Sequence, residues 1–329
     1  MAVKRIVVVG CGSIGVRHAR LLARRSELRV ELCDSSAACL ADAVAQIGNR
    51  PCFDDYRAML ATLPDAVVIA TPHACHADQL IAAVEAGIHV LCEKPMSDSL
   101  PDALRMAEAA ARASSVVDFG FTLHFHPGLR RLKSLIAAGE LGRIVHMHCR
   151  VGTYATLACS RTRHQAHVEG ALLMDYVHQP DILHWLSGCE PAGVYMSASQ
   201  GGELPLTSNP NVADIVLDYE GALRAAIHIN YVQAPQRHEY EVVGDRAWAL
   251  LDAESNSLRV GSRERDAQTI ETFQFERDEL FVAEHQAFLD TIEGTRGPES
   301  PCENALVSMR VVDGALRSWK QSARVALSR

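Results

Sequence analysis

A glycine-rich turn between two short apolar runs constrains this chain more than any other feature. Residues 6–9 are all β-branched and apolar, which is typical of a strand buried on both faces. The sequence Gly10-Cys11-Gly12-Ser13-Ile14-Gly15 follows directly, and apolar residues then recur at helical spacing. A second apolar run, residues 28–33, ends at Asp34. The pattern predicts a strand, a tight turn, a helix and a second strand within about thirty residues.

Each glycine of this turn has a physical task in binding a dinucleotide. Gly10 lets the chain turn sharply, Gly12 lets a pyrophosphate approach the backbone, and Gly15 lets the helix pack close to the strand. The helix that starts at Ser13 and Ile14 offers unpaired N–H groups and the positive end of its dipole to the phosphates. We therefore predict that these five residues bind the cofactor.

The residues after the second strand indicate which dinucleotide is bound. The carboxylate of Asp34 can accept both ribose hydroxyls of an adenosine, and it would repel a 2′-phosphate. Ser35 and Ser36 follow, with no arginine there to hold a phosphate. We predict NAD(H) in preference to NADP(H), with Asp34 and Ser35 at the ribose.

Length, charge and cysteine content narrow the class of protein. A chain of 329 residues is too long for one ordinary core, so two domains are expected. A net charge of −8 without a long run of one sign argues against nucleic acid and membrane surfaces as partners. No apolar stretch of about 18 residues predicts a membrane span, and Gly10 and Gly12 interrupt the pattern of a signal peptide. The ten irregularly spaced cysteines are interpreted as buried thiols in a reducing cytoplasm.

The order of apolar patterns predicts two different domains. Strand and helix patterns alternate through residue 121, which predicts a Rossmann-like α/β domain with a parallel, doubly wound sheet over residues 1–121. One of its helices is expected over residues 97–113, capped by Ser97 or Asp98. Residues 122–329 predict an α+β substrate-binding and oligomerisation domain with a large, mostly antiparallel open sheet; its C-terminal helix is a candidate to pack back on the first domain. The expected strands of that sheet cover residues 143–151, 192–199, 212–219, 222–230, 239–243, 246–252, 257–261 and 269–275.

Polar tripeptides follow two of the strands in the first domain. In a sheet of order 3-2-1-4-5-6 the first, fourth and fifth strands are neighbours, and ligands bind at their carboxyl ends. Thr71-Pro72-His73 and Glu93-Lys94-Pro95 should therefore flank the nicotinamide end of the cofactor. Charged side chains at a buried strand end are costly unless they are used or paired, so Lys94 is expected to point into the crevice.

An apolar helix expected over residues 170–186 carries a second group of polar side chains. Asp175 and His178 are three residues apart, hence on adjacent faces of one helix, where a carboxylate can orient an imidazole for acid–base work. A hydrogen-bonded core histidine is the alternative. Whether Asp175 or Asp181 partners His178 stays open, and Pro180 predicts a kink or break.

Taken together, these motifs resemble the Gfo/Idh/MocA family of sugar and inositol oxidoreductases, over nearly the whole chain. The Glu-Lys-Pro element is the most specific match. The residues that carry the resemblance are Gly10-x-Gly12-x-x-Gly15 with Arg17-His18-Ala19, Asp34, Ala70-Thr71-Pro72-x-x-x-His76, Ala86-Gly87-x-His89-Val90-x-x-Glu93-Lys94-Pro95, Gly120-Phe121, His126-Pro127, Leu141-Gly142-Arg143-Ile144, and His178-x-x-Asp181 with Trp185-Leu186-x-Gly188.

The resemblance implies hydride transfer between a nicotinamide and a carbinol of a sugar, polyol or sugar-nucleotide-like substrate. It implies that Lys94 lies near the reacting hydroxyl, that His178 is the acid/base, and that Asp175 holds His178 or the substrate. His76 and Thr122 would neighbour the nicotinamide. The open sheet of the second domain would form a homodimer or homotetramer. The chain departs from the family pattern where Met174, Thr122 and His124 replace the usual aspartate, asparagine and arginine.

Substrate specificity is expected from the loops around residues 154–169 and 233–240. Arg163, with Arg161 and His164, and Arg237 with His238, are candidates to meet hydroxyls or a phosphate, although a solvent-facing role fits each equally well. His124 is a further candidate substrate contact.

Three other readings remain beside the dehydrogenase. NAD could be used transiently to hydrolyse a glycoside without net redox change, or the chain could be a non-catalytic dinucleotide-binding regulator. The spacings His124-x-His126 and His146-x-His148 would suit a metal on an extended strand, but no matching cysteine or carboxylate cluster accompanies them, so no metal is predicted.

Overall fold

The structure is a computed structural model that describes residues 4–159, 165, 168–202, 204, 210–264 and 267–327. The chain forms two compact units, residues 1–125 with 276–309, and residues 126–275 with 310–329. The first unit thus extends four residues beyond the expected boundary and takes in a segment near the end of the chain. That segment holds α10 (Arg277–Ile292) and the first part of α11 (Cys302–Gln321).

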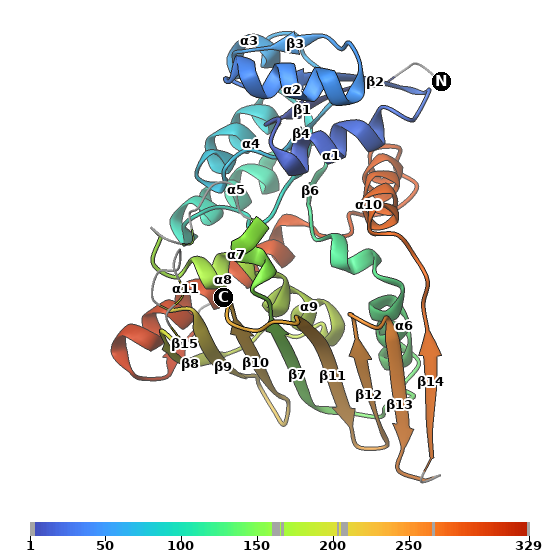
Figure 1. Cartoon of the computed structure of the whole chain (residues 1–329), viewed down its shortest axis with the longest axis vertical. Helices are drawn as coiled ribbons and strands as arrows, with labels where there is room; N and C mark the ends of the chain where they lie inside the picture. The colour runs from blue at the N-terminus through green and yellow to red at the C-terminus, as the bar shows by residue number, and fades with distance from the viewer. Residues whose placement is uncertain are drawn as a thin grey trace. The chain divides into compact units, whose positions relative to one another are not determined.

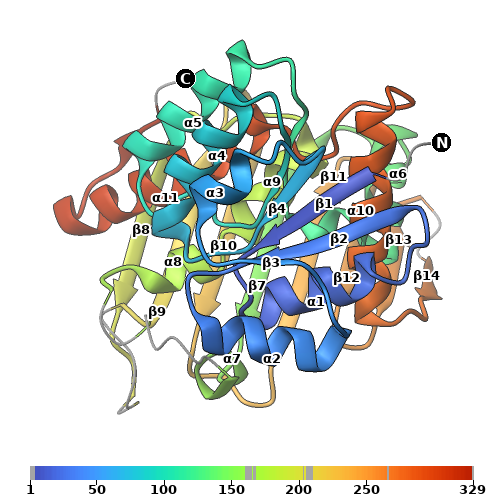
Figure 2. The same ribbon diagram turned by 90° about the horizontal axis from the view of Figure 1, so that it is seen from above.

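A six-stranded parallel sheet of order β3-β2-β1-β4-β5-β6 forms the centre of the first unit. Figure 2 shows β3, β2, β1 and β4 side by side. The order agrees with the prediction. Its strands are β1 (Lys4–Val9), β2 (Leu28–Cys33), β3 (Cys52–Phe53), β4 (Ala66–Ile69), β5 (His89–Cys92) and β6 (Val117–Phe119). β3 has only two residues, which is too short to produce a pattern in the sequence.

Helices connect these strands as the sequence predicted, with one correction at a cap. The helical segments of this unit, besides α10 and α11, are α1 (Ser13–Leu22), α2 (Ala37–Ile47), α3 (Tyr56–Leu60), η1 (His73–Cys75), α4 (His76–Glu85), α5 (Leu100–Arg112) and η2 (Thr122–Phe125). The cap of α5 is Ser99, whose hydroxyl accepts the N–H of Asp102, so Ser97 or Asp98 as the cap was wrong. Ser97 instead donates its hydroxyl to the carbonyl of Ser99.

The first and third glycines of the turn are required by the backbone. Gly10 has φ +92°, a region that favours glycine, and a Cβ there would lie 2.6 Å from the carbonyl oxygen of Ala70. A Cβ on Gly15 would lie 1.8 Å from the carbonyl oxygen of Gly10. At Gly12, by contrast, nothing lies within 4 Å of the added carbon. The turn therefore has no room for a side chain at Gly10 and Gly15 but has room for one at Gly12.

This difference gives a stability prediction. Gly15→Ala is expected to destabilise the first unit by about 3 kcal/mol, because two backbone segments must separate to admit a methyl group. The melting temperature should fall by about 5–10 °C in differential scanning calorimetry. Gly12→Ala is the matched control and should melt like the wild type; a similar loss in both variants would contradict the packing argument.

A nine-stranded sheet of order β14-β13-β12-β11-β7-β10-β9-β8-β15 forms the second unit (Figure 1). β7 and β10 pair in parallel and the other neighbours antiparallel, so the prediction of a mostly antiparallel sheet is confirmed. Its strands are β7 (Ile144–Gly152), β8 (Gly193–Ser199), β9 (Val212–Asp218), β10 (Arg224–Asn230), β11 (Arg237–Gly244), β12 (Ala247–Asp252), β13 (Ser257–Ser262), β14 (Ala267–Thr272) and β15 (Val325–Ala326).

Helices lie on this sheet and along its connections. α6 (Pro127–Ala137) packs on β12 and β13, and α9 (His178–Ser187) packs on β7 and β10. α7 (Ala155–Cys159) follows β7. None of the helices in the described part of the chain is long and apolar enough to span a bilayer.

The single helix expected over residues 170–186 is wrong. Two helices occupy the segment, α8 (Ala171–Asp175) and α9, with the break at residues 176 and 177. The cause is Pro180, because an uninterrupted helix would press its ring against the carbonyl of Tyr176, four residues earlier. As the third residue of α9, Pro180 sits in a first turn where a missing N–H costs nothing. Asp175 therefore ends one helix and His178 begins the next.

Candidate functional site

The carboxyl ends of three neighbouring strands form the candidate cofactor edge of the first unit. β1 pairs with β4, and β4 pairs with β5, so the turns after these strands lie along one edge of the sheet. Those turns are the glycine turn, residues 71–76 and residues 93–95. Among the predicted cofactor residues, Gly12, Ser13, Ser35 and Pro72 are exposed, and Ile14, Asp34, Thr71, His73, Glu93, Lys94 and Thr122 are half-buried.

Asp34 connects the end of β2 to the glycine turn. Its carboxylate accepts the backbone N–H of Cys11 at 2.6 Å and that of Ser36 at 2.8 Å. This residue therefore orders the turn in addition to any contact with a ribose. The sequence motif did not indicate that second task, because the bond to Cys11 joins segments on different strands.

His76, predicted beside the nicotinamide, is buried and joins two turns of the candidate edge. Its Nε2 lies 2.9 Å from the carbonyl oxygen of Thr71 and its Nδ1 3.0 Å from that of Pro95. Burial holds the pKa of His76 below the ordinary histidine value. A neutral imidazole has a single N–H, so the ring donates to one of these two carbonyl oxygens at a time. The contacts indicate that His76 joins the turn after β4 to Pro95, the residue that follows Lys94.

In the second unit, Asp175 lies in a hydrogen-bonded group that the sequence did not reveal. Its Oδ2 accepts the hydroxyl of Tyr231 at 2.5 Å and the side-chain amide of Gln165 at 2.9 Å. Burial and the Asp175 charge raise the pKa of Tyr231 far above the ordinary tyrosine value, so its proton remains on the hydroxyl. No spacing rule could have found Tyr231, because it follows Asp175 by 56 residues.

His178 is the first residue of α9 and is half-buried, while Asp181 in the same turn is fully buried. The helix break separates His178 from Asp175, so the predicted placement of both side chains on one helix is wrong. The Asp175 carboxylate accepts hydrogen bonds from Tyr231 and Gln165. The hydrogen bonds to Tyr231 and Gln165 fix the Asp175 carboxylate three residues before His178, the first residue of α9.

The other candidate residues have ordinary structural partners or lie outside the described residues. His124, a predicted substrate contact, is fully buried, with its Nδ1 2.9 Å from the hydroxyl of Ser300. His126 accepts the N–H of Gly128 and so caps α6. Arg163 falls outside the described residues. Within the described ranges no three His, Cys, Asp or Glu side chains are grouped as a metal site would require.

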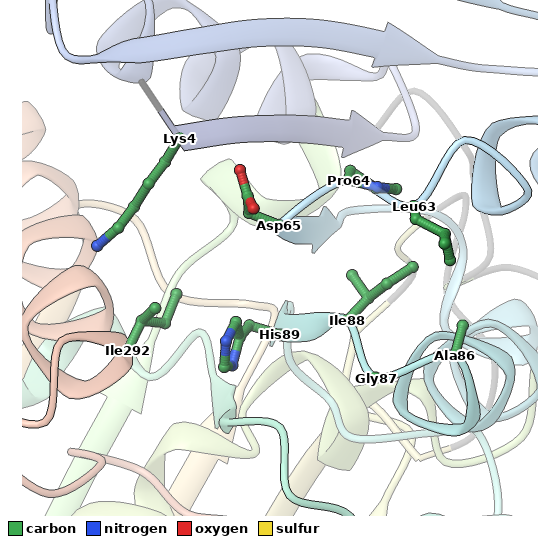
Figure 3. Close-up of a pocket in the computed structure, with 9 residues that line it drawn as sticks. All are labelled: Lys4, Leu63, Pro64, Asp65, Ala86, Gly87, Ile88, His89 and Ile292. Carbon is green, nitrogen blue, oxygen red and sulfur yellow. The ribbon is translucent and has the colours of Figure 1, made fainter. Parts of the chain in front are cut away.

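A cavity of about 300 Å³ lies at the opposite edge of the first sheet (Figure 3). Lys4 begins β1, Asp65 precedes β4 and His89 begins β5, so the cavity opens at the amino ends of the strands. Ligands of doubly wound sheets bind at the carboxyl ends. This cavity is therefore not the predicted dinucleotide site.

Comparison with known proteins agrees with these features. A family model described as an oxidoreductase family with an NAD-binding Rossmann fold, GFO_IDH_MocA, matches residues 4–121. The model of the GFO/IDH/MocA C-terminal domain matches residues 129–250. A curated relative, inositol 2-dehydrogenase 2 of Mycolicibacterium vanbaalenii, is 28% identical over 273 residues, or 79% of this chain and 75% of the relative.

Solved structures share the fold over the full length. Levoglucosan dehydrogenase in complex with NADH and levoglucosan has a TM-score of 0.89 at 18% identity, covering 99% of this chain and 100% of that one. The scyllo-inositol dehydrogenase of Lactobacillus casei, with bound NAD(H) and scyllo-inositol, has a TM-score of 0.84 at 21% identity and covers 100% of both chains. With both domain models matched in succession, the chain belongs to the Gfo/Idh/MocA family of oxidoreductases.

Proposed function

We propose that this protein is an NAD(H)-dependent dehydrogenase that transfers hydride between the nicotinamide and a secondary alcohol or ketone of a sugar, polyol or sugar-nucleotide-like substrate. The observation that carries the proposal is the placement of Lys94 at the end of β5, in line with the glycine turn after β1. The names of the relatives, which act on inositols and levoglucosan, support the substrate class.

The residues of the turn fit a dinucleotide. Open space in front of Gly12 and the exposed start of α1 at Ser13 leave room for a pyrophosphate to reach backbone N–H groups. The half-buried carboxylate of Asp34 follows β2 and would accept the hydroxyls of an adenosine ribose. Gly10, Gly12, Gly15 and Asp34 would hold NAD, which when bound supplies the acceptor for the hydride.

The protein's own groups would handle the charge and the proton. In the oxidation of an alcohol, His178 takes the hydroxyl proton as general base, and in the reduction of a ketone it returns that proton. The ammonium of Lys94 stabilises the alkoxide that develops on the substrate oxygen, a charge present mainly in the transition state. Asp175, fixed by Tyr231 and Gln165, holds the substrate or the imidazole.

The proposal is tested by measuring NADH absorbance while the protein is incubated with NAD and each member of a panel of polyols, aldoses and nucleotide sugars.

The preference for NAD over NADP is expected to depend on Asp34. Asp34→Ala should raise the KM for NAD about 10–100-fold, since hydrogen bonds to a charged group are lost, and should leave the KM for NADP unchanged or lower. Steady-state kinetics with both cofactors measure the ratio. Asp34→Asn is the control that keeps an acceptor for the N–H of Cys11. An unchanged NAD-to-NADP ratio in both variants would contradict this assignment.

We also propose a homodimer or homotetramer formed through the nine-stranded sheet. Its register puts Tyr195, Val216 and Ile270 on one face, opposite the face with the buried strand residues. These side chains are 42%, 44% and 60% exposed, and Tyr195 and Val216 are direct partners on neighbouring strands.

The nine cysteines with described side chains are free thiols, which supports a reducing, cytoplasmic location.

A further inference from the structure

We propose that His18 and Glu93 form a buried pair that positions Lys94 for catalysis. His18 belongs to α1, one turn beyond the glycine turn, and Glu93 follows β5 directly. This inference rests on the proposed function of Lys94. It assigns a positioning role to His18 and to Glu93, which the motif predicted only as flanking the nicotinamide end of the cofactor.

The contacts form a continuous chain that ends at the backbone of Lys94. His18 Nε2 lies 2.8 Å from Glu93 Oε1, and Glu93 Oε2 accepts the backbone N–H of Lys94 at 3.2 Å. On its other side, His18 Nδ1 lies 2.7 Å from His285 Nε2 in α10. One carboxylate thus links α1 to the residue that carries the proposed catalytic ammonium.

Packing restricts the movement of the pair. The side chain of His18 is fully buried and that of Glu93 is 13% exposed. The ring of Phe281 meets the edge of the His18 ring at a centroid distance of 5.3 Å. Gly120 leaves room for the carboxylate, because a Cβ there would lie 3.0 Å from Glu93 Cδ. The imidazole and the carboxylate have little freedom to turn away from each other.

The charges of the group favour an ionised Glu93. Burial alone raises the pKa of Glu93, but the hydrogen bond from His18 and the charges of His18 and Lys94 outweigh it, so the pKa lies below the ordinary value. Burial holds the pKa of His285 well below that of an ordinary histidine, so its ring is neutral. The Glu93 carboxylate, which also accepts the backbone N–H of Lys94, therefore carries a fixed negative charge one residue from the proposed catalytic side chain.

Glu284 offers a matched control in the same buried region. It is 3% exposed, and neither carboxyl oxygen has a hydrogen-bond partner among the described residues. Burial, together with the charges of Glu93 and Asp118, raises its pKa well above the ordinary value, which favours the protonated, uncharged carboxyl. Glu284→Gln therefore removes a buried carboxyl without removing a charge.

The test compares turnover with cofactor affinity in six variants of the full chain. Glu93→Gln and His18→Leu should lower kcat about 10–100-fold, the loss typical of groups that hold a functional residue, with the KM for NAD changed less than about threefold. His18→Gln keeps a donor for Glu93 and should recover most of the turnover. The double variant His18→Leu, Glu93→Gln should be no slower than Glu93→Gln, because both changes break one link. Glu284→Gln should match the wild type.

The outcomes separate this inference from the proposed function. Wild-type kcat in Glu93→Gln, with Lys94→Met inactive, would overturn the positioning role and leave the proposed function standing. Equal losses in His18→Gln and His18→Leu, or additive losses in the double variant, would also overturn it. Wild-type kcat in Lys94→Met would overturn the proposed function and this inference together. Melting temperatures and NAD binding identify a variant that fails to fold. If His18→Leu fails to fold, Glu93→Gln alone carries the test.

Discussion

Lys94→Met is expected to lower kcat about 10³-fold while the affinity for NAD changes little. Methionine keeps most of the length and volume of lysine but cannot stabilise an alkoxide, and loss of one such donor typically costs about 10²–10³ in turnover. The backbone of residue 94 stays held by Glu93, so the turn after β5 should survive the change. NADH absorbance measures the turnover, and calorimetric titration with NAD measures the affinity.

Lys320→Met is the matched control for this variant. Lys320 is an exposed lysine that pairs with Glu169 at the surface, where an ion pair contributes little. Its replacement should leave kcat and KM unchanged. Undiminished turnover in Lys94→Met would remove the ammonium from the mechanism, and a parallel loss of NAD affinity would instead make Lys94 chiefly a cofactor ligand.

His178→Asn is expected to lower kcat about 10²–10⁴-fold, the usual contribution of a positioned general acid or base. Asparagine can still hydrogen-bond a substrate hydroxyl but cannot take up its proton near neutral pH. Added imidazole should restore part of the turnover by carrying the missing proton. Stopped-flow measurement of the first turnover separates this effect from slow product release.

His184→Asn on the same helix is the control for His178→Asn. His184 lies in the last turn of α9, with its Nδ1 3.0 Å from the carbonyl oxygen of Cys189. Its substitution therefore measures the effect of replacing a histidine in α9 that has no proposed role in the reaction. We expect kcat within about twofold of the wild type, as for a substitution outside the site. If His178→Asn also stays in that range, a different residue moves the proton.

Local patterns were sufficient to predict most strands and helices of the parallel sheet in the first unit. The β-branched runs of β1 and β4, the glycine turn and the alternation of strands with helices follow from period and turn chemistry, which a short window of sequence contains. The sheet order and the edge that carries Lys94 follow from the same rules. The mostly antiparallel second sheet was likewise visible as consecutive strands without intervening helices.

Contacts between distant segments could not be read in that way. The addition of residues 276–309 to the first unit, the contact of His285 with His18, and the bond of Tyr231 to Asp175 each join parts of the chain with no common period. The break before α9 was misplaced because a proline acts on a carbonyl four residues earlier. Sequence alone determined which residue types stand at the strand ends, since that depends on local spacing. Only tertiary structure decided which buried partners hold them, since hydrogen bonds form between groups that folding brings within 3 Å.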